Sequence, residues 1–510
     1  MKIGRQDAQI DERPGFWLDG GTHASEWTGI MSTLYTMSHW VNALTNGDPD
    51  EVRYFEQHTA YVMPCISPDA FQALMEGAPF IRSTLRPPPN QDVRRGLAAQ
   101  DLSGDGAVRW MRWKDPAGGF VLDPQRPMFM RPRTLDDPDT DAFFVCQEGL
   151  FLNWDGHQWV QAAREFGLDL NRNFPAHWAP FSMFGMDGGA YPLSEPESRA
   201  VVDTFTRFPF IGAAVTNHTY TGCILTQPYR EDTPLPSGDV KLMYRLAIDA
   251  VKGTGYRVFK TYPDFSYDKK KAIVGVWSDT LSTVFGIPGY TLELWDPFAF
   301  AGIENDNPAA FFTHPDPESI AKIIDAFCEL PETTSPWTPF EHPQLGPVEI
   351  GGIDYYRTVR NPPESHLAAE CERGLTVAQR VRKAVPRVEL SVHLTAESHA
   401  LTRVDAQLDN YGFLSTSGLL HGESLPGTPV VRVQITHGDG VELVSGEESQ
   451  KGCHLDGWGS TSPGGAHSVY PHLSDRGHRH LATWWIRGHG EITLEWVGGH
   501  GGCGSKIIEV

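Results

Sequence analysis

The first two thirds of the chain alternate short apolar runs with segments of helical spacing. GFWLDGG, AYVMPCI and FIGAAVT are continuous apolar runs of the length of buried strands. After the first of them, Ile30, Leu34, Met37 and Val41 fall on one face of a helix, and PESIAKIIDAFCEL predicts a last helix near residue 330. Buried strands that alternate with helices predict an α/β fold with a mixed, largely parallel sheet flanked by helices.

The apolar positions change to a period of two in the last part of the chain. RVELSVHLT places Val388, Leu390, Val392 and Leu394 on one face, and TRVDAQL, VVRVQIT and GEITLEWV repeat the pattern. Turns rich in Gly, Asn and Pro separate these runs. The pattern predicts a C-terminal antiparallel β-sandwich.

Two segments show little periodicity. Residues 333–347 lie in a stretch rich in Pro and Thr, which predicts a linker between a first domain, 1–332, and the β-sandwich domain, 348–510. Residues 86–145 are rich in Pro, Arg and Asp, which indicates a long functional loop or a small subdomain inserted in the first domain.

The composition excludes several classes of protein. Asp and Glu outnumber Lys and Arg by 64 to 42, and a net charge of −22 argues against binding to nucleic acid or to anionic membranes. No apolar run has the length of a membrane span, and the first residues lack the apolar centre of a signal peptide, so we expect a cytoplasmic protein. The 7 cysteines are scattered without a CxxC pair, which favours reduced thiols over a disulfide scaffold.

Polar residues stand where predicted strands end. His23 and Glu26 follow the Gly-Gly end of one strand, and a His and a carboxylate at such a turn can face one metal ion. His218 follows the strand FIGAAV, at the edge of the predicted sheet. Glu293 lies in the apolar run YTLEL, where burying a carboxylate is costly unless it is paired or titrates. Taken singly, a surface His, a capping His and a salt-bridged strand-end Glu are the commoner explanations.

A further polar segment is DLNRNF. Its neighbours Asn171 and Arg172 offer a fork of donors that suits a carboxylate, although a polar loop with a surface salt bridge would look the same.

In this order along the chain, HASE, DLNRNF, NHTY and TLEL resemble the signature segments of the zinc carboxypeptidases, peptidase family M14. YPLSEPESRAV and VMPCISPDAF are similar to two more segments of that family, and the resemblance covers about residues 4–330. It implies one catalytic Zn²⁺ bound by His23, Glu26 and His218, with Asp169 hydrogen-bonded to the ring nitrogen of His23 that does not bind the metal.

The resemblance also implies the roles of the substrate-facing residues. Glu293 would be the general base that takes a proton from the zinc-bound water, and Arg82, in FIRSTLR, would polarise the scissile carbonyl. Asn171 and Arg172 would hold the free C-terminal carboxylate of a peptide substrate.

The sequence departs from the family at three of these places. Ser25 stands where the family often has an arginine before the zinc Glu. The mobile tyrosine of the family falls on Lys271, counted back from Glu293, and Tyr267 is the nearest candidate. GVWSDT differs from the usual specificity pocket, so the preferred terminal residue is not predicted; Ser278 is the expected pocket-lining residue.

Three remaining segments complete the prediction. The insertion at 86–145 lies between Arg82 and Asn171, so we expect it at the cleft rim, where it narrows access. Within it, DLSGDG looks like half a calcium loop, but the twelfth position is Arg112, which argues against calcium. GHGGCG near the C-terminus has no following helix, which argues against a nucleotide site.

The sequence therefore predicts a zinc metallocarboxypeptidase with an accessory β-sandwich through which it could oligomerise. Two alternatives stay open. One is a zinc amidase or deacylase acting on acyl amino acids or cell-wall peptides, which would use the same zinc, base and clamp. The other is an inactive scaffold that binds peptide ends.

Overall fold

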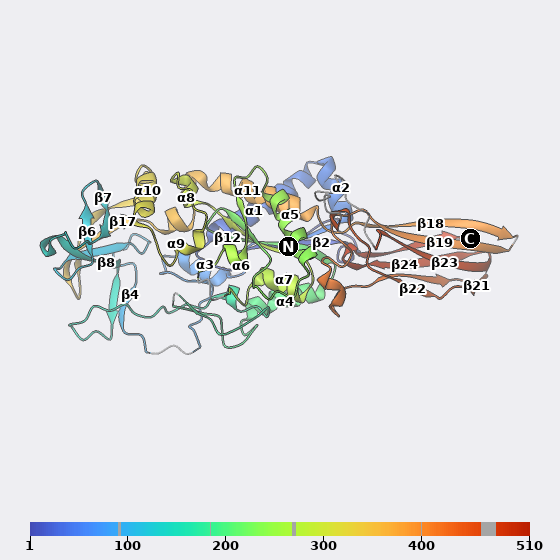
Figure 1. Ribbon diagram of the computed structural model, residues 1–510, viewed down its shortest axis with the longest axis horizontal. Helices are drawn as coiled ribbons and strands as arrows, with labels where there is room; N and C mark the ends of the chain where they lie inside the picture. The colour runs from blue at the N-terminus through green and yellow to red at the C-terminus, as the bar shows by residue number, and fades with distance from the viewer. Residues whose placement is uncertain (90–92, 184, 268–271, 399, 461–475) are drawn as a thin grey trace.

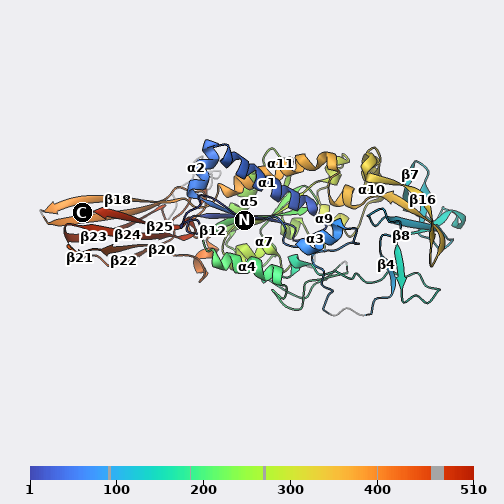
Figure 2. The ribbon, with the colours of Figure 1, turned by 180° about the vertical axis from the view of Figure 1, so that it is seen from behind.

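The protein is elongated, with β-sheets at both ends and a helix-covered sheet between them (Figures 1 and 2). This computed structural model describes residues 1–89, 93–183, 185–267, 272–398, 400–460 and 476–510. None of the helices in these ranges is long and apolar enough to cross a bilayer.

The central sheet is mixed and runs in the order β1-β3-β2-β12-β15-β13-β14. Parallel ladders join β3 to β2, β2 to β12, β12 to β15 and β13 to β14, whereas β1–β3 and β15–β13 are antiparallel. The strands are β1 (Lys2–Ile3), β2 (Gly15–Gly20), β3 (Thr59–Met63), β12 (Ile211–Thr219), β13 (Cys223–Thr226), β14 (Arg257–Lys260) and β15 (Gly289–Leu294).

Helices cover both faces of this sheet because successive side chains of a strand point to opposite sides. Phe16 and Leu18 of β2 pack under α1, α2, α5 and α11, and Trp17 packs toward α4 and α7. The helices are α1 (Trp27–Thr45), α2 (Pro49–Gln57), α3 (Pro68–Met75), α4 (Pro196–Arg207), α5 (Ser237–Val251), α6 (Thr261–Asp264), α7 (Trp277–Val284), α8 (Pro297–Phe300), α9 (Pro308–Phe311), α10 (Pro317–Cys328) and α11 (Glu364–Arg382).

The segment 333–347, predicted to be a linker, is not one. It forms most of the hairpin of β16 and β17, which joins strands of the insertion in a six-stranded sheet of order β16-β17-β5-β8-β6-β7. Pro336 and Pro339 argued against a strand because proline lacks a backbone N–H. They are tolerated because β16 is an edge strand, where a missing N–H can face solvent. The strands are β5 (Trp110–Lys114), β6 (Phe120–Asp123), β7 (Arg126–Pro132), β8 (Ala142–Gln147), β16 (Thr334–His342) and β17 (Gly346–Ile353).

Helix α11 lies in the range 348–510 that was predicted to be β-sandwich, but it belongs to the core of the central sheet. Leu375, Val377, Ala378 and Val381 are buried in the same hydrophobic cluster as β2 and β12. Two short antiparallel pairs lie elsewhere, β4 (Gly96–Ala99) with β9 (Gly149–Leu152) and β10 (Ser182–Met183) with β11 (Met186–Asp187).

The C-terminal part contains two four-stranded antiparallel sheets, β18-β19-β23-β21 and β22-β20-β24-β25, so the predicted antiparallel strands are confirmed. Buried side chains of both sheets form one hydrophobic cluster, which includes Val388, although Leu394 at the far end of the same face is exposed. The strands are β18 (Val388–Ser398), β19 (Leu401–Asn410), β20 (Val431–His437), β21 (Val441–Ser445), β22 (Ser449–Gly452), β23 (Arg479–Gly488), β24 (Glu491–Gly498) and β25 (Cys503–Glu509).

These C-terminal sheets contact the amino ends of the central parallel strands. His500 Nδ1 donates to the carbonyl of Pro209, just before β12, at 2.8 Å, and the Cys503 amide donates to the carbonyl of Glu12 at 2.9 Å. Chemistry in a parallel sheet gathers at the carboxyl ends of the strands. The C-terminal sheets therefore lie at the end of the central sheet opposite to the predicted site.

Candidate metal centre and active site

The turn from β2 to α1 brings His23 and Glu26 together. Gly20 and Gly21 allow a tight turn, because Gly21 has φ +68° and a side chain on Gly20 would meet the Gly29 carbonyl oxygen at 2.5 Å. His23 Nδ1 and Glu26 Oε2 lie 3.0 Å apart at the start of α1.

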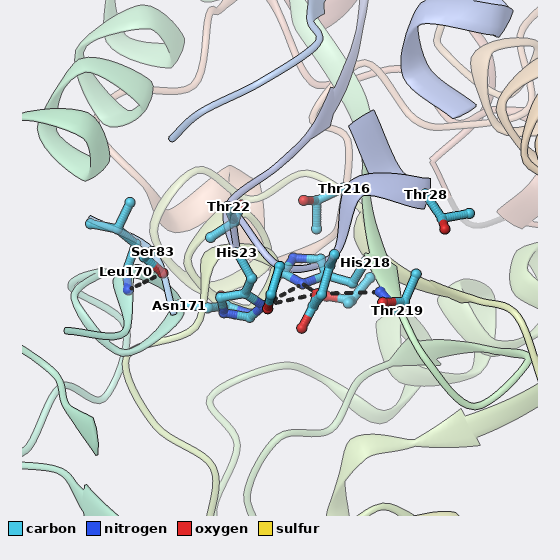
Figure 3. Close-up of polar contacts among 12 residues, drawn as sticks. Thr22, His23, Thr28, Ser83, Leu170, Asn171, Thr216, His218 and Thr219 are labelled. Carbon is cyan, nitrogen blue, oxygen red and sulfur yellow. Dashed lines mark hydrogen bonds and ion pairs between the residues drawn. The ribbon is translucent and has the colours of Figure 1, made fainter. Parts of the chain in front are cut away.

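His218, on β12, completes a compact triad with these two residues. Its Nδ1 lies 3.0 Å from His23 Nδ1 and 3.0 Å from Glu26 Oε2, and the two imidazole rings lie edge to face with their planes at 72° (Figure 3). The exposed fractions are 3% for His23, 2% for Glu26 and 1% for His218. Two ring nitrogens and a carboxylate oxygen thus converge on one point away from water.

This arrangement fits a zinc ion. Ligand atoms of a tetrahedral site with bonds of about 2.0–2.1 Å lie roughly 3.3 Å apart, close to the observed triangle. His23 Nε2 faces Asp169 Oδ1 at 3.0 Å, and an N–H donated there leaves a lone pair on Nδ1 toward the other ligand atoms. Three N and O donors with an open position are the catalytic kind of zinc site.

Asp169 and Arg82 hold the triad in place. Asp169 caps the short helix Leu170–Arg172 and accepts from Arg82 Nε at 3.1 Å, and Arg82 Nη1 donates to Glu26 Oε1 at 2.9 Å. Burial alone would favour the neutral acid, but the Arg82 guanidinium and His23 hold the pKa of Asp169 well below its usual range. Arg82 therefore pairs with two buried carboxylates.

Glu293 stands beside the triad on β15. In the parallel ladder of β12 and β15 it is the register partner of His218. Burial raises the pKa of Glu293 to about 7, although His218 and Arg82 oppose the shift. A carboxyl group with such a pKa can both accept and donate a proton near neutral pH.

A cavity of about 500 Å³ opens onto His23, Glu26 and Glu293. The predicted site residues that line it are His23, Glu26, Arg82, Asn171, Arg172, Tyr267 and Glu293. Residues of the insertion, among them Leu97 and Trp110, line it as well. The structure therefore brings most of the predicted site to one cavity.

Asn171 and Arg172 are anchored at the base of the cavity. Asn171 Oδ1 accepts from the Trp277 amide at 3.0 Å, and Arg172 Nη1 donates to the Asn171 carbonyl at 2.6 Å. Arg172 is 5% exposed, and its Nε has no hydrogen-bond partner among the described residues. The pair thus keeps donor capacity for a ligand.

Two predictions about the pocket wall have different outcomes. Tyr267 lines the cavity and packs against the rings of Phe265 and Phe312, whereas Lys271 lies outside the described residues. Ser278 is fully buried behind the lining: its hydroxyl lies 2.5 Å from that of Tyr229 and 2.9 Å from that of Thr291, and these two line the cavity in its place. The prediction of Ser278 as a lining residue is therefore wrong.

Sequence reasoning missed the residues that reach the cavity from beyond residue 332. Tyr355, Tyr356 and Arg360, on and next to the turn Tyr356–Arg360, all line it. Arg360 Nη1 lies 3.2 Å from Glu26 Oε1. No periodicity marks this turn, and the only signal was a polar, aromatic segment directly after a Gly-Gly pair.

The zinc carboxypeptidase model matches residues 1–118 and 145–315, so the chain belongs to the zinc carboxypeptidase family. A model of a domain of unknown function, DUF8731, matches residues 387–509. The match ends before α11 and before Arg360.

Three solved structures illustrate the similarity. Bovine thrombin-activatable fibrinolysis inhibitor, in complex with tick carboxypeptidase inhibitor, is 15% identical, with 75% of this chain and 84% of that chain covered and a TM-score of 0.38. Carboxypeptidase A from Helicoverpa armigera is 17% identical, with 65% of each chain covered and a TM-score of 0.36. The tripeptide-bound cell shape determinant Csd4 from Helicobacter pylori is 9% identical, with 100% and 99% covered and a TM-score of 0.27.

Proposed function

We propose that this protein is a zinc metallocarboxypeptidase that removes the C-terminal residue of a peptide. One observation supports it. His23, Glu26 and His218 converge beside Glu293, and Arg172 lines the same cavity as Glu293. A metal site, a buried base and a carboxylate-binding cation are the three parts that such a reaction needs.

In this proposal His23 Nδ1, His218 Nδ1 and one oxygen of Glu26 would hold a single Zn²⁺. When bound, zinc polarises the scissile carbonyl and makes water acidic enough to yield a nucleophile at neutral pH. Asp169 keeps the His23 ring oriented through its 3.0 Å contact with Nε2.

The remaining residues bind the substrate and move a proton. Asn171 and Arg172 hold the terminal carboxylate, which selects the last peptide bond. Glu293 takes a proton from the attacking water and passes it to the leaving amine nitrogen. Arg82, which Asp169 and Glu26 fix in place, stabilises the oxygen of the carbonyl under attack.

Replacing Glu293 tests this mechanism. Glu293→Gln should lower kcat by about 100- to 10,000-fold, because the amide cannot accept the proton, while zinc content measured by mass spectrometry stays at one ion per chain. His23→Ala should lose the metal instead. Glu389→Gln, the same exchange at an exposed position of β18, is the control and should leave kcat unchanged. Normal turnover by Glu293→Gln would disprove the mechanism.

The insertion is proposed to restrict substrate size. Because Leu97 and Trp110 close part of the cavity, kcat/KM should fall steeply from blocked dipeptides to long or folded chains. Equal rates for a dipeptide and a 20-residue peptide with the same last two residues would contradict this.

The same restriction keeps the amidase alternative open, since acyl amino acids and short cell-wall peptides would also fit a cavity of about 500 Å³. Assays with blocked dipeptides, acyl amino acids and muropeptides separate the two reactions. A scaffold that only binds peptide ends would turn over none of them. The C-terminal sheets, at the far end from the cavity, are proposed to serve partner contact or oligomerisation.

A further inference from the structure

Arg360 is a largely buried cation that lies beside the proposed metal ligands. The reaction proposed above gives it no role. Its side chain is 13% exposed, and its Nη1 lies 3.2 Å from Glu26 Oε1, an oxygen that Arg82 already binds at 2.9 Å. Its Nε has no hydrogen-bond partner among the described residues. A buried charged N–H without a hydrogen-bond partner costs free energy, so we expect a ligand to bind at Arg360.

The fold holds Arg360 in this position through its neighbour. The side-chain Nδ2 of Asn361 donates to the Ser25 carbonyl at 2.9 Å, and its Oδ1 accepts from the backbone amide of Thr28 at 3.1 Å. The Arg360 guanidinium lies 5.3 Å from the ring centre of Tyr220 and 5.8 Å from that of Tyr355. This turn lies outside the residues that match the family model.

The charge of the cavity indicates an anionic ligand. Its described lining holds five arginines against three glutamates, and Asp169 behind the lining pairs with Arg82, which leaves a surplus of one positive charge in a protein of net charge −22. The arginines are Arg82, Arg94, Arg164, Arg172 and Arg360. A divalent cation at the triad would enlarge this surplus beyond what one terminal carboxylate at Arg172 balances.

Arg164 lies on the same wall as Arg360. Its guanidinium lies 4.3 Å from the Phe80 ring centre, and Phe80 stacks on Tyr356, which precedes Arg360 in the same turn. Burial lowers the pKa of Arg164, and the charges of Arg82 and Arg360 lower it further. An anion bound between these guanidinium groups would relieve their repulsion.

Contacts link Arg360 to Arg172 through Glu26, Arg82 and Asp169. Arg360 and Arg82 share Glu26 Oε1. Arg82 binds the Asp169 side chain, and the Arg172 amide donates to the Asp169 carbonyl at 3.0 Å. In the substrate orientation proposed above, with the terminal carboxylate at Arg172 and the scissile carbonyl at Arg82, Arg360 would face the residue before the scissile bond.

We propose that Arg360, with Arg164 beside it, forms a second anion subsite that selects peptides with an acidic side chain at the residue before the scissile bond. The orientation of the peptide in this proposal rests on the proposed function. In this subsite, the guanidinium groups of Arg360 and Arg164, already held in place and partly shielded from water, would bind the carboxylate of the substrate side chain.

The test compares acetyl-Glu-Phe with acetyl-Gln-Phe, which differ in charge but hardly in size. Phe suits the terminal position because Leu225, Phe265 and Phe312 line the cavity near Tyr267. The wild type should favour the Glu peptide by about tenfold or more in kcat/KM. Arg360→Met should abolish the preference, and Arg360→Lys should keep part of it.

Arg94→Met is the matched control. Arg94 lines the same cavity but is paired with Glu165 at 2.6 Å, so its removal should leave the Glu-to-Gln ratio unchanged. Zinc content is measured for every variant because Arg360 touches Glu26. An equal fall for both peptides in Arg360→Met, or no preference in the wild type, would overturn the subsite.

A binding measurement separates this proposal from the proposed function. If the wild type hydrolyses neither peptide, the carboxypeptidase proposal fails, and calorimetry with the zinc-loaded protein decides the subsite alone. Tighter binding of acetyl-Glu-Phe that disappears in Arg360→Met supports the subsite. Equal Kd values for the two peptides refute it.

Discussion

At the scale of single residues, Asp169 joins the candidate metal triad to the candidate substrate clamp. Its Oδ1 faces His23 Nε2 at 3.0 Å and accepts from the Asn171 amide at 2.9 Å, while Oδ2 accepts from Arg82. Both oxygens act only as acceptors. A side chain of the same shape that also donates cannot satisfy all three partners.

Asp169→Asn should therefore weaken zinc binding by about 10- to 100-fold, because its NH₂ group must face a donor, either His23 or Arg82. A competition titration with a chelator measures the zinc Kd. Asp249→Asn, at an exposed position on α5, controls for the loss of one charge. An unchanged zinc Kd would show that Asp169 does not orient His23.

At the scale of elements, the close approach of α1 to β12 sets the distance between Glu26 and His218. A side chain at Gly29 would place its Cβ 2.4 Å from the Asn217 carbonyl oxygen, directly before His218. The backbone of β12 cannot yield as a flexible side chain would. Only glycine allows the helix to lie this close to the strand.

Gly29→Ala should lower the free energy of unfolding by about 1–3 kcal/mol and also weaken zinc binding, because α1 must move away with Glu26 at its start. Urea denaturation and the zinc titration are the two measurements. Gly238→Ala, on α5 with open space around it, should change stability by less than about 1 kcal/mol. If Gly29→Ala loses stability while its zinc Kd stays unchanged, the close packing of α1 on β12 does not position the metal ligands.

At the scale of the whole molecule, His500 lies where the C-terminal sheets meet the central sheet. It is 4% exposed, and burial lowers its pKa from 6.5 to about 4. The folded protein thus resists protonation of His500, whereas the unfolded chain accepts a proton below about pH 6.5. Its contribution to stability is present above that pH and is lost as the pH falls toward 4.

Between pH 7 and 4.5 the wild type should lose about 2–3 kcal/mol more unfolding free energy than His500→Gln, whose amide can still donate to Pro209. Urea denaturation at the two pH values measures the difference. His393→Gln, exposed on β18, should behave like the wild type. If the stability of His500→Gln and of the wild type depends equally on pH, protonation of His500 does not contribute to the loss of stability.

Local patterns predicted the helices and strands of the central sheet. The strands around Phe16, the helix from Trp27 and the alternating run at Val388 were predictable because each depends on a periodicity within about ten residues. His23 and Glu26 directly follow β2, and His218 lies near the carboxyl end of β12; they were expected as zinc ligands because their segments occur in the same order as the motifs of the zinc carboxypeptidases. The order of the strands in the central sheet depends on pairing between distant segments, which no local pattern encodes.

The amino-acid sequence by itself determined the elements of the α/β core and the antiparallel strands at the C-terminus, since neighbouring residues decide both, and the order of its motifs indicated which residues could form the triad. Only the tertiary structure decided that residues 334–353 complete the sheet of the insertion, that α11 closes the central core and that Ser278 lies behind the cavity wall. It also brought Arg360 to Glu26 across 334 positions of the chain. Such contacts arise from the shapes and charges of packed surfaces, and these exist only after the chain has folded.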